Sequence, residues 1–197
     1  MPTERYGCRN WYRAMEYSIE PIKKEVRICD YADGYVDFGV TQACCSACSD
    51  YGKTWSCPPF DFDPVEFWKC FDVLQIYGYR LSYRGERTLR QMEDALWKEK
   101  ERLDAELREM EREHPGSMAL SLGSCRLCET CTRPEGGQCR HPELVRHSIE
   151  SVGGNVEKTL KDLCGIEIEW AADGDLPEHF VLVGGLLRKE NEDETSH

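Results

Sequence analysis

The sequence lacks the features that would place the protein in a membrane or direct it out of the cell. No apolar run approaches the ~20 residues that a membrane-spanning helix needs. Residues 1–10 contain no apolar stretch of the kind found in a secretory signal. We therefore expect a cytoplasmic protein that has no membrane partner.

Positive charge is also scarce. The chain has 25 Lys and Arg residues against 37 Asp and Glu residues, and its formal net charge is -12. A field of this sign repels phosphate backbones. Nucleic acid is therefore not expected as a partner.

The motifs of several common enzyme classes are missing. The chain has no GxGxxG, GxxxxGK[ST] or HExxH motif, which argues against dinucleotide, nucleoside-triphosphate and zinc-protease sites. The CxxxCxxC motif of radical enzymes that use adenosylmethionine begins at Cys44 and Cys48, but Tyr51 occupies the third position. No catalytic residues are predicted, and whether the protein is an enzyme stays open.

Cysteine is abundant, with 12 residues in a chain of 197. The cytoplasm keeps thiols reduced, so these cysteines indicate metal binding or redox chemistry rather than a disulfide framework. A secreted disulfide protein is the alternative, but the leader that would support it is not seen.

The stronger cysteine group is Cys125-x2-Cys128-x2-Cys131-x7-Cys139, with Pro142 shortly after it. Three thiolates at three-residue intervals can wrap one face of an iron-sulfur cluster, and a later cysteine can complete the set. A zinc site with four cysteines normally uses two separated CxxC pairs, which this run fits poorly. The spacing therefore favours an iron-sulfur cluster, with zinc as the alternative.

The other group contains Cys44, Cys45, Cys48 and Cys57, the last followed by Pro58 and Pro59. Either Cys44 or Cys45 can precede Cys48 at a suitable interval, and adjacent cysteines rarely bind one ion together. Nearby aromatic residues, Tyr51 and Trp55, either shield a cluster from water or belong to the ordinary core.

These motifs resemble a known family. The string YGKTWSCPP preceded by spaced cysteines, and then GSCRLCETC followed by CRHP, is similar to a family of predicted metal-binding proteins of unknown function. The resemblance runs from about residue 44 to 168 and implies iron-sulfur proteins common in anaerobic bacteria and archaea. It carries over the ligands Cys44, Cys48, Cys57, Cys125, Cys128, Cys131 and Cys139. Cys45 is an addition, and His147-Ser148-Ile149-Glu150 replaces the family's usual small-residue helix start.

Seven matching cysteines are one short of two complete four-thiolate sets. The eighth ligand is Cys45, Cys29, Cys70 or Cys8, or one iron is left open to water or substrate. The main hypothesis is a protein with two [4Fe-4S]-type clusters that transfers electrons to a redox partner protein or serves as an accessory redox subunit. The alternatives are a zinc-stabilised interaction module and an enzyme whose open cluster iron binds substrate.

The predicted fold is α+β: a mostly antiparallel sheet, a long amphipathic helix and a cysteine-rich metal-binding lobe. Strands are expected near 71–83, 117–122, 166–170 and 179–187, a long helix over 86–113, and short helices over 143–151 and 156–164. Strands or extended arms are also predicted at residues 26–29 and 35–38, and residues 19–21 are expected to break the regular structure. A loop is predicted at residues 42–60. Residues 1–190 are expected to form one domain with cysteine segments at 44–59 and 125–142, followed by a disordered tail at 191–197.

Overall fold

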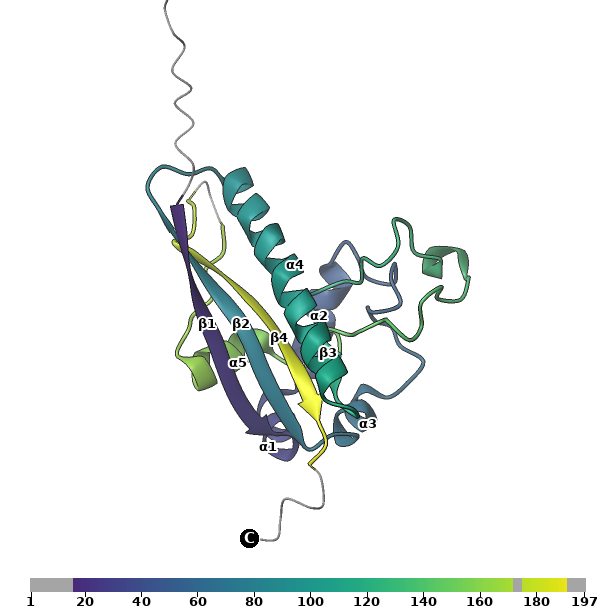
Figure 1. The fold of residues 1–197 in the computed structure, drawn as a ribbon. Helices are drawn as coiled ribbons and strands as arrows, with labels where there is room; N and C mark the ends of the chain where they lie inside the picture. Colours follow the sequence, from purple (N-terminus) through teal and green to yellow (C-terminus); the bar gives the residue numbers. More distant parts are fainter. Residues whose placement is uncertain (1–15, 172–174, 191–197) are drawn as a thin grey trace, which may run out of the picture.

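The computed structural model describes residues 16–171 and 175–190. It contains a four-stranded antiparallel sheet with the strand order β1-β2-β4-β3 (Figure 1). The strands are β1 (Glu16–Arg27), β2 (Val73–Arg84), β3 (Met118–Leu120) and β4 (His179–Arg188). The helical segments are α1 (Ile28–Tyr35), α2 (Phe38–Ala47), α3 (Pro64–Lys69), α4 (Leu89–Glu113), η1 (Arg133–Glu135), α5 (Val156–Thr159) and η2 (Leu160–Cys164). The predicted α+β class, with its antiparallel sheet and long helix, is confirmed.

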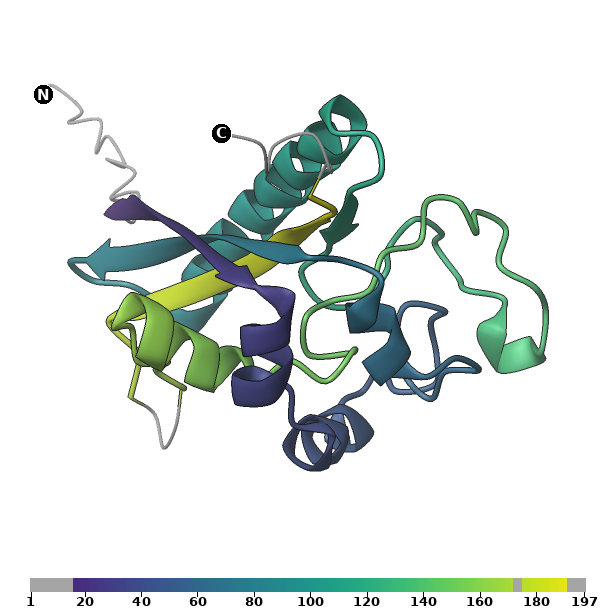
Figure 2. The same ribbon diagram turned by 90° about the horizontal axis from the view of Figure 1, so that it is seen from below.

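Both faces of the sheet are buried, because successive residues of β2 point to opposite sides. Leu74 and Ile76 pack with α1 and η2 on one face. Tyr79 and Leu81 pack with α4 on the other face. Figure 2 shows the sheet lying between α4 on one side and α1 and α5 on the other.

Helix α4 confirms the predicted long helix except for its first residues. The helix begins at Leu89 rather than at 86 because Thr88 caps it. The Thr88 hydroxyl accepts the Gln91 N–H at 3.3 Å, and the Gln91 side chain accepts the Thr88 N–H at 2.9 Å. This reciprocal pair satisfies two backbone donors at the helix start.

Three of the four expected strands are present as β2, β3 and β4, but the strand predicted at 166–170 is wrong. Ile166 and Ile168 do pack against the core, which explains the alternating pattern. The backbone there is held by a side chain instead of a strand, since the Glu167 carbonyl lies 3.0 Å from His179 Nε2. The alternating pattern reflects the burial of one face of this segment. It does not indicate whether a neighbouring strand is present to form backbone hydrogen bonds.

The expectations for the first part of the chain are also corrected. Residues 19–21 do not break a strand, because Pro21 lies inside β1. β1 is an edge strand, where a residue without a backbone N–H is tolerated. Residues 26–29 cover the end of β1 and the start of α1, and 35–38 join α1 to α2.

Two segments around the cysteines differ from expectation. The predicted loop at 42–60 begins inside α2, whose apolar periodicity is weak because only Thr41 is buried. The predicted helix at 143–151 is a series of turns. Ser148 and Ser151 exchange side-chain bonds with each other's backbone N–H groups there, which competes with helix formation. The helical prediction at 156–164 is confirmed by α5 and η2.

The two cysteine segments project together from the sheet, as both ribbon views show (Figures 1 and 2). We call residues 44–59 the first cysteine segment and residues 125–142 the second cysteine segment. The described part of the chain has no helix that is both long enough and apolar enough to cross a membrane.

Candidate metal centre

The second cysteine segment gathers all of its cysteines around one small cavity. The four thiols are half-buried, and Trp55, Leu127 and Val145 are among the other residues that line the cavity. Burial raises the pKa of the Cys125 thiol, and the other three cysteines of the segment raise it further. These four side chains are therefore close enough to interact electrostatically. They are Cys125, Cys128, Cys131 and Cys139.

Backbone N–H groups point at sulfur atoms in both segments. The Asp50 N–H donates to Cys48 Sγ at 3.5 Å, and the His141 N–H donates to Cys139 Sγ at 3.4 Å. In each case the donor lies two residues after the cysteine. Such bonds stabilise a thiolate more than a thiol, because the thiolate carries the charge. This local geometry suits metal-bound sulfur.

The first cysteine segment is assembled less tightly. Cys44 and Cys48 are exposed, whereas Cys45 and Cys57 are half-buried. Burial, with smaller contributions from the Glu150 carboxylate and the other three thiols of the segment, raises the pKa of the Cys45 thiol to about 11. All four cysteines of this segment therefore lie in one neighbourhood, including the additional Cys45.

Helix α2, which carries two of these cysteines, is fixed by a turn distant in sequence. The Asp37 N–H donates to the Gly153 carbonyl at 2.8 Å, and Val36 forms a bridge with Gly154. Gly153 has a φ of +94°, and a Cβ there would lie 2.4 Å from the Phe38 ring. Glycine is thus needed both for the backbone conformation and for the close approach of α2. The contact brings the start of α2 next to the turn that carries Glu150.

The two cysteine segments interlock through polar contacts. The Cys125 N–H donates to Ser56 Oγ at 2.8 Å, and Ser124 Oγ donates to Asp50 Oδ2 at 2.6 Å. The Arg133 guanidinium lies over the Trp55 ring and donates to three carbonyls of the first segment. Those carbonyls belong to Thr54 at 2.5 Å, Cys57 and Pro59. The segments therefore form one joint structure rather than two separate loops.

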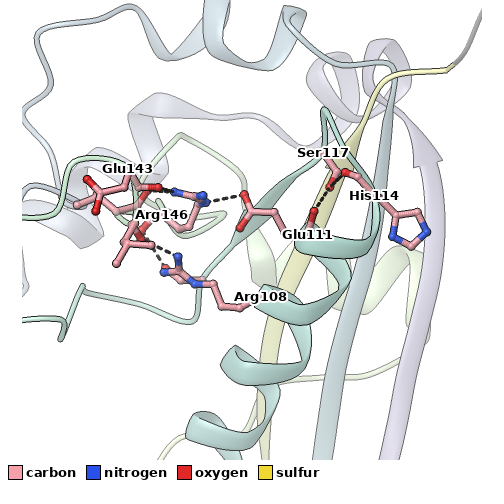
Figure 3. A network of polar contacts seen from close by, with 9 residues as sticks. Arg108, Glu111, His114, Ser117, Glu143 and Arg146 are labelled. Carbon is pink, nitrogen blue, oxygen red and sulfur yellow. Dashed lines mark hydrogen bonds and ion pairs between the residues drawn. The ribbon is translucent and has the colours of Figure 1, made fainter.

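Helix α4 supports the second cysteine segment at both ends. Before it, Asp104 Oδ1 accepts the Leu122 N–H at 3.1 Å. After it, Arg108 donates to the Leu144 carbonyl at 2.6 Å, and Arg146 Nε lies 2.7 Å from Glu111 Oε1 (Figure 3). The side chains of Arg146 and Glu111 are largely buried, at 16% and 13% exposure. The segment is thus tied to the most regular element of the fold.

The other described cysteines show no sign of joining either set. Cys29 is exposed in α1, and its thiol lies 3.8 Å from Asp30 Oδ1. Cys70, a candidate for the eighth ligand, is exposed at the end of α3, and its thiol donates to the Glu66 carbonyl. Cys164 is half-buried and packs against the core. Cys8 lies outside the described residues.

Within residues 16–171 and 175–190, no group of three or more Cys, His, Asp or Glu side chains is arranged to hold a metal ion.

Comparison of the chain with known protein families supports the metal binding that its many cysteines indicate. The model of a family described as a predicted metal-binding protein (DUF2284) matches residues 28–187. The chain belongs to this family. The match is longer than the resemblance seen in the motifs, and it contains both cysteine segments. No curated protein and no solved structure is significantly similar to the chain.

One polar atom indicates whether the cavity lined by the four cysteines of the second segment suits a sulfur-rich metal group. Trp55 Nε1 is buried, and no described residue accepts its hydrogen. The indole lines the same cavity as the four cysteines. Buried donors are nearly always paired, so this N–H indicates an acceptor in the cavity, and thiolate or sulfide sulfur fits. The residues present therefore fit an iron-sulfur cluster held by the second cysteine segment.

Two residues that shape the site carry no signal in the sequence. Ser56 is 1% exposed, and besides accepting from Cys125 it presents its carbonyl to His147 at 3.1 Å. Glu150 is accessible to water, yet the protein around it desolvates its carboxyl group and raises the pKa. Neither residue lies at a ligand spacing. Their roles follow from tertiary contacts that only the fold creates.

Proposed function

We propose that this protein is an iron-sulfur protein with two [4Fe-4S]-type clusters, one in each cysteine segment, that serves in electron transfer. The observation that carries the proposal is the cavity lined by Cys125, Cys128, Cys131 and Cys139 together with the unpartnered Trp55 N–H. These four cysteines would hold the second cluster. When bound, such a cluster supplies a one-electron redox couple.

Cluster ligation is favoured over zinc by the spacing of the cysteines along the chain. The second cysteine segment has three cysteines at three-residue intervals, which suits one face of a cluster. A zinc site with four cysteines normally uses two separated CxxC pairs. The N–H groups of Asp50 and His141 that face sulfur are also the contacts that tune cluster potentials. These N–H groups would stabilise the negative charge on the thiolate ligands.

For the first cluster we propose Cys44, Cys45, Cys48 and Cys57. The support for Cys45 as the eighth ligand is its proximity to the other three thiols, to which its pKa responds. Cys29 and Cys70 have hydrogen-bond partners elsewhere. A complete set of thiolates suits electron transfer better than substrate binding at an open iron.

A redox partner protein would dock over the second cysteine segment. Leu127 is 41% exposed between Cys125 and Cys128, and Trp97 of α4 is 42% exposed beside it. Arg126 and Lys100 flank the Trp97 ring at 4.3 and 4.8 Å. An exposed apolar pair with basic neighbours suits a partner with an acidic surface.

The test is analysis of iron, acid-labile sulfide and zinc in full-length protein purified without oxygen. The proposal predicts about eight iron and eight sulfide ions per chain. Stoichiometric zinc without sulfide would replace it with the zinc-stabilised module. About four iron and four sulfide ions would restrict the proposal to one cluster.

A further inference from the structure

A large cavity lies beside the cavity lined by the four cysteines of the second segment and shares one of these cysteines, Cys139, with it. Its volume is about 1020 Å³, at the upper end of the range of ~300–1,000 Å³ for small-molecule sites. It shares Trp55, Cys139 and Val145 with the cavity that the four cysteines line. A molecule bound there would therefore lie next to the proposed second cluster.

One wall of this cavity is built from phenylalanine rings. Phe60 and Phe62 stack with their ring centroids 4.6 Å apart and an interplanar angle of 17°. Phe67 lies 5.9 Å from Phe62, and all three rings are only partly buried. Aromatic side chains have a large apolar surface, and leaving this surface in contact with water is unfavourable. An open cavity with such a wall therefore suits a flat apolar ring, which would cover that surface.

His147 supplies the polar group of the cavity. Its ring packs edge-on against Phe60 and Phe67, with centroid distances of 4.7 and 5.8 Å. Its Nδ1 lies 3.1 Å from the Ser56 carbonyl, which can only accept a hydrogen, so Nδ1 carries the proton. In the neutral ring Nε2 is then an acceptor, and no described residue donates to it.

The arginines that line the cavity are already engaged. Arg133 donates to three carbonyls of the first cysteine segment, and Arg146 pairs with Glu111 and with two carbonyls. Asp61 and Glu143 add negative charge to the lining. Because the Arg146 charge is offset by Glu111 and the lining adds two more carboxylates, an anionic ligand would meet repulsion that an uncharged ligand does not.

We propose that this cavity binds an uncharged, planar aromatic molecule with a hydroxyl group that donates to His147 Nε2. Phenols and fused-ring aromatic alcohols are the class that fits the rings, the acceptor and the carboxylates of the lining. The inference rests on side chains of the described chain and does not depend on which metal the cysteines bind.

The experiment measures binding of three probes to full-length, anaerobically purified protein by isothermal titration calorimetry. The probes are 2-naphthol, 2-methoxynaphthalene and 2-naphthoate, which share the ring but differ in the donor and the charge. We expect 2-naphthol to bind about tenfold more tightly than 2-methoxynaphthalene, because only the former donates a hydrogen bond. No binding of 2-naphthol, or tighter binding of 2-naphthoate, would overturn the proposal.

Variants then locate the site. His147→Phe should abolish the preference for 2-naphthol over 2-methoxynaphthalene while leaving the apolar wall in place. Phe62→Ala should weaken both neutral probes at least about fivefold, since it removes a wall of the cavity. Phe71→Ala is the matched control, because Phe71 packs 5.9 Å from Phe67 but does not line the cavity. Equal effects of the two Phe variants, or an unchanged preference in His147→Phe, would contradict the assignment.

A second measurement keeps the proposal testable if a variant does not fold. Wild-type crystals soaked in 6-bromo-2-naphthol would show the bromine by anomalous scattering. The proposal requires the bromonaphthyl ring against Phe62 and His147 with its oxygen within hydrogen-bonding distance of Nε2. A ring bound elsewhere on the protein would refute it.

Discussion

The two cysteine segments reach a similar arrangement by different routes. In the second segment four half-buried cysteines from a single stretch of chain line one cavity. In the first, two exposed and two half-buried cysteines are divided between the end of α2 and a loop, and α2 is fixed by the distant turn at Gly153. The comparison teaches that the second set depends mainly on local spacing, whereas the first depends on tertiary contacts.

The sharpest challenge to this comparison is Cys45→Ser. If Cys45 completes the first set, the variant should lose about four iron and four sulfide ions per chain and keep the remainder. Cys29→Ser is the control, because Cys29 is exposed in α1 and bonds only to Asp30. Full metal content in Cys45→Ser, determined by iron and sulfide analysis, would instead point to an open iron in the first segment.

The interlock between the segments is tested by Arg133→Met. The substitution keeps the length of the side chain but removes three charge-assisted bonds to carbonyls of the first segment. We expect a loss of about 3 kcal/mol in the free energy of unfolding, measured in urea. Arg140→Met, which removes one exposed bond to the Thr130 carbonyl, should cost less than about 1 kcal/mol. Equal losses would mean that the segments are not coupled through Arg133.

The support from α4 is tested by Glu111→Gln, which breaks the largely buried ion pair with Arg146 (Figure 3). We expect a destabilisation of about 1–2 kcal/mol, because Arg146 keeps its carbonyl partners but loses its counter-charge. Glu109→Gln removes the exposed pair with Arg112 on the same helix and should change stability by less than about 0.5 kcal/mol. Urea unfolding of the two variants side by side makes the comparison, and equal effects would exclude a special role for Glu111.

The smallest expected effect comes from Trp55→Phe. This change keeps an aromatic ring between the cavities but removes the unpartnered N–H. A hydrogen bond to sulfur favours the more negative, reduced cluster, so its loss should lower the midpoint potential of the second centre by about 30 mV. Redox titration monitored by electron paramagnetic resonance measures the shift. An unchanged potential would mean that the indole does not donate to the cluster.

Local patterns predicted the body of the fold well and the cysteine lobe only in part. The periodicity of α4 and the β-branched residues of β2 are strong because each element buries a regular face. Helix α2 was missed because it packs few residues on the core and depends instead on Asp37 as its cap. The turn at Ser148 and Ser151 was predicted as a helix because side-chain bonds to the backbone leave no periodic signal.

The candidate site shows the same division. The spacing of Cys125, Cys128 and Cys131 indicates a ligand set without any knowledge of the fold. The spacing left Cys45 unassigned, because its proximity to Cys44, Cys48 and Cys57 depends on the fold. The contributions of Ser56, Trp55 and Glu150 likewise arise from residues more than 60 positions apart in sequence that the fold brings together.

The central claim is that each cysteine segment holds a cluster of its own. The most direct measurement is the iron and sulfide content of two complementary variants, purified without oxygen, in which all four cysteines of one segment are replaced by serine. The replaced residues are Cys44, Cys45, Cys48 and Cys57 in one variant and Cys125, Cys128, Cys131 and Cys139 in the other. The account predicts that each variant retains about four iron and four sulfide ions per chain. Loss of all iron and sulfide from both variants would contradict it, because that result would mean a single centre shared by the two segments.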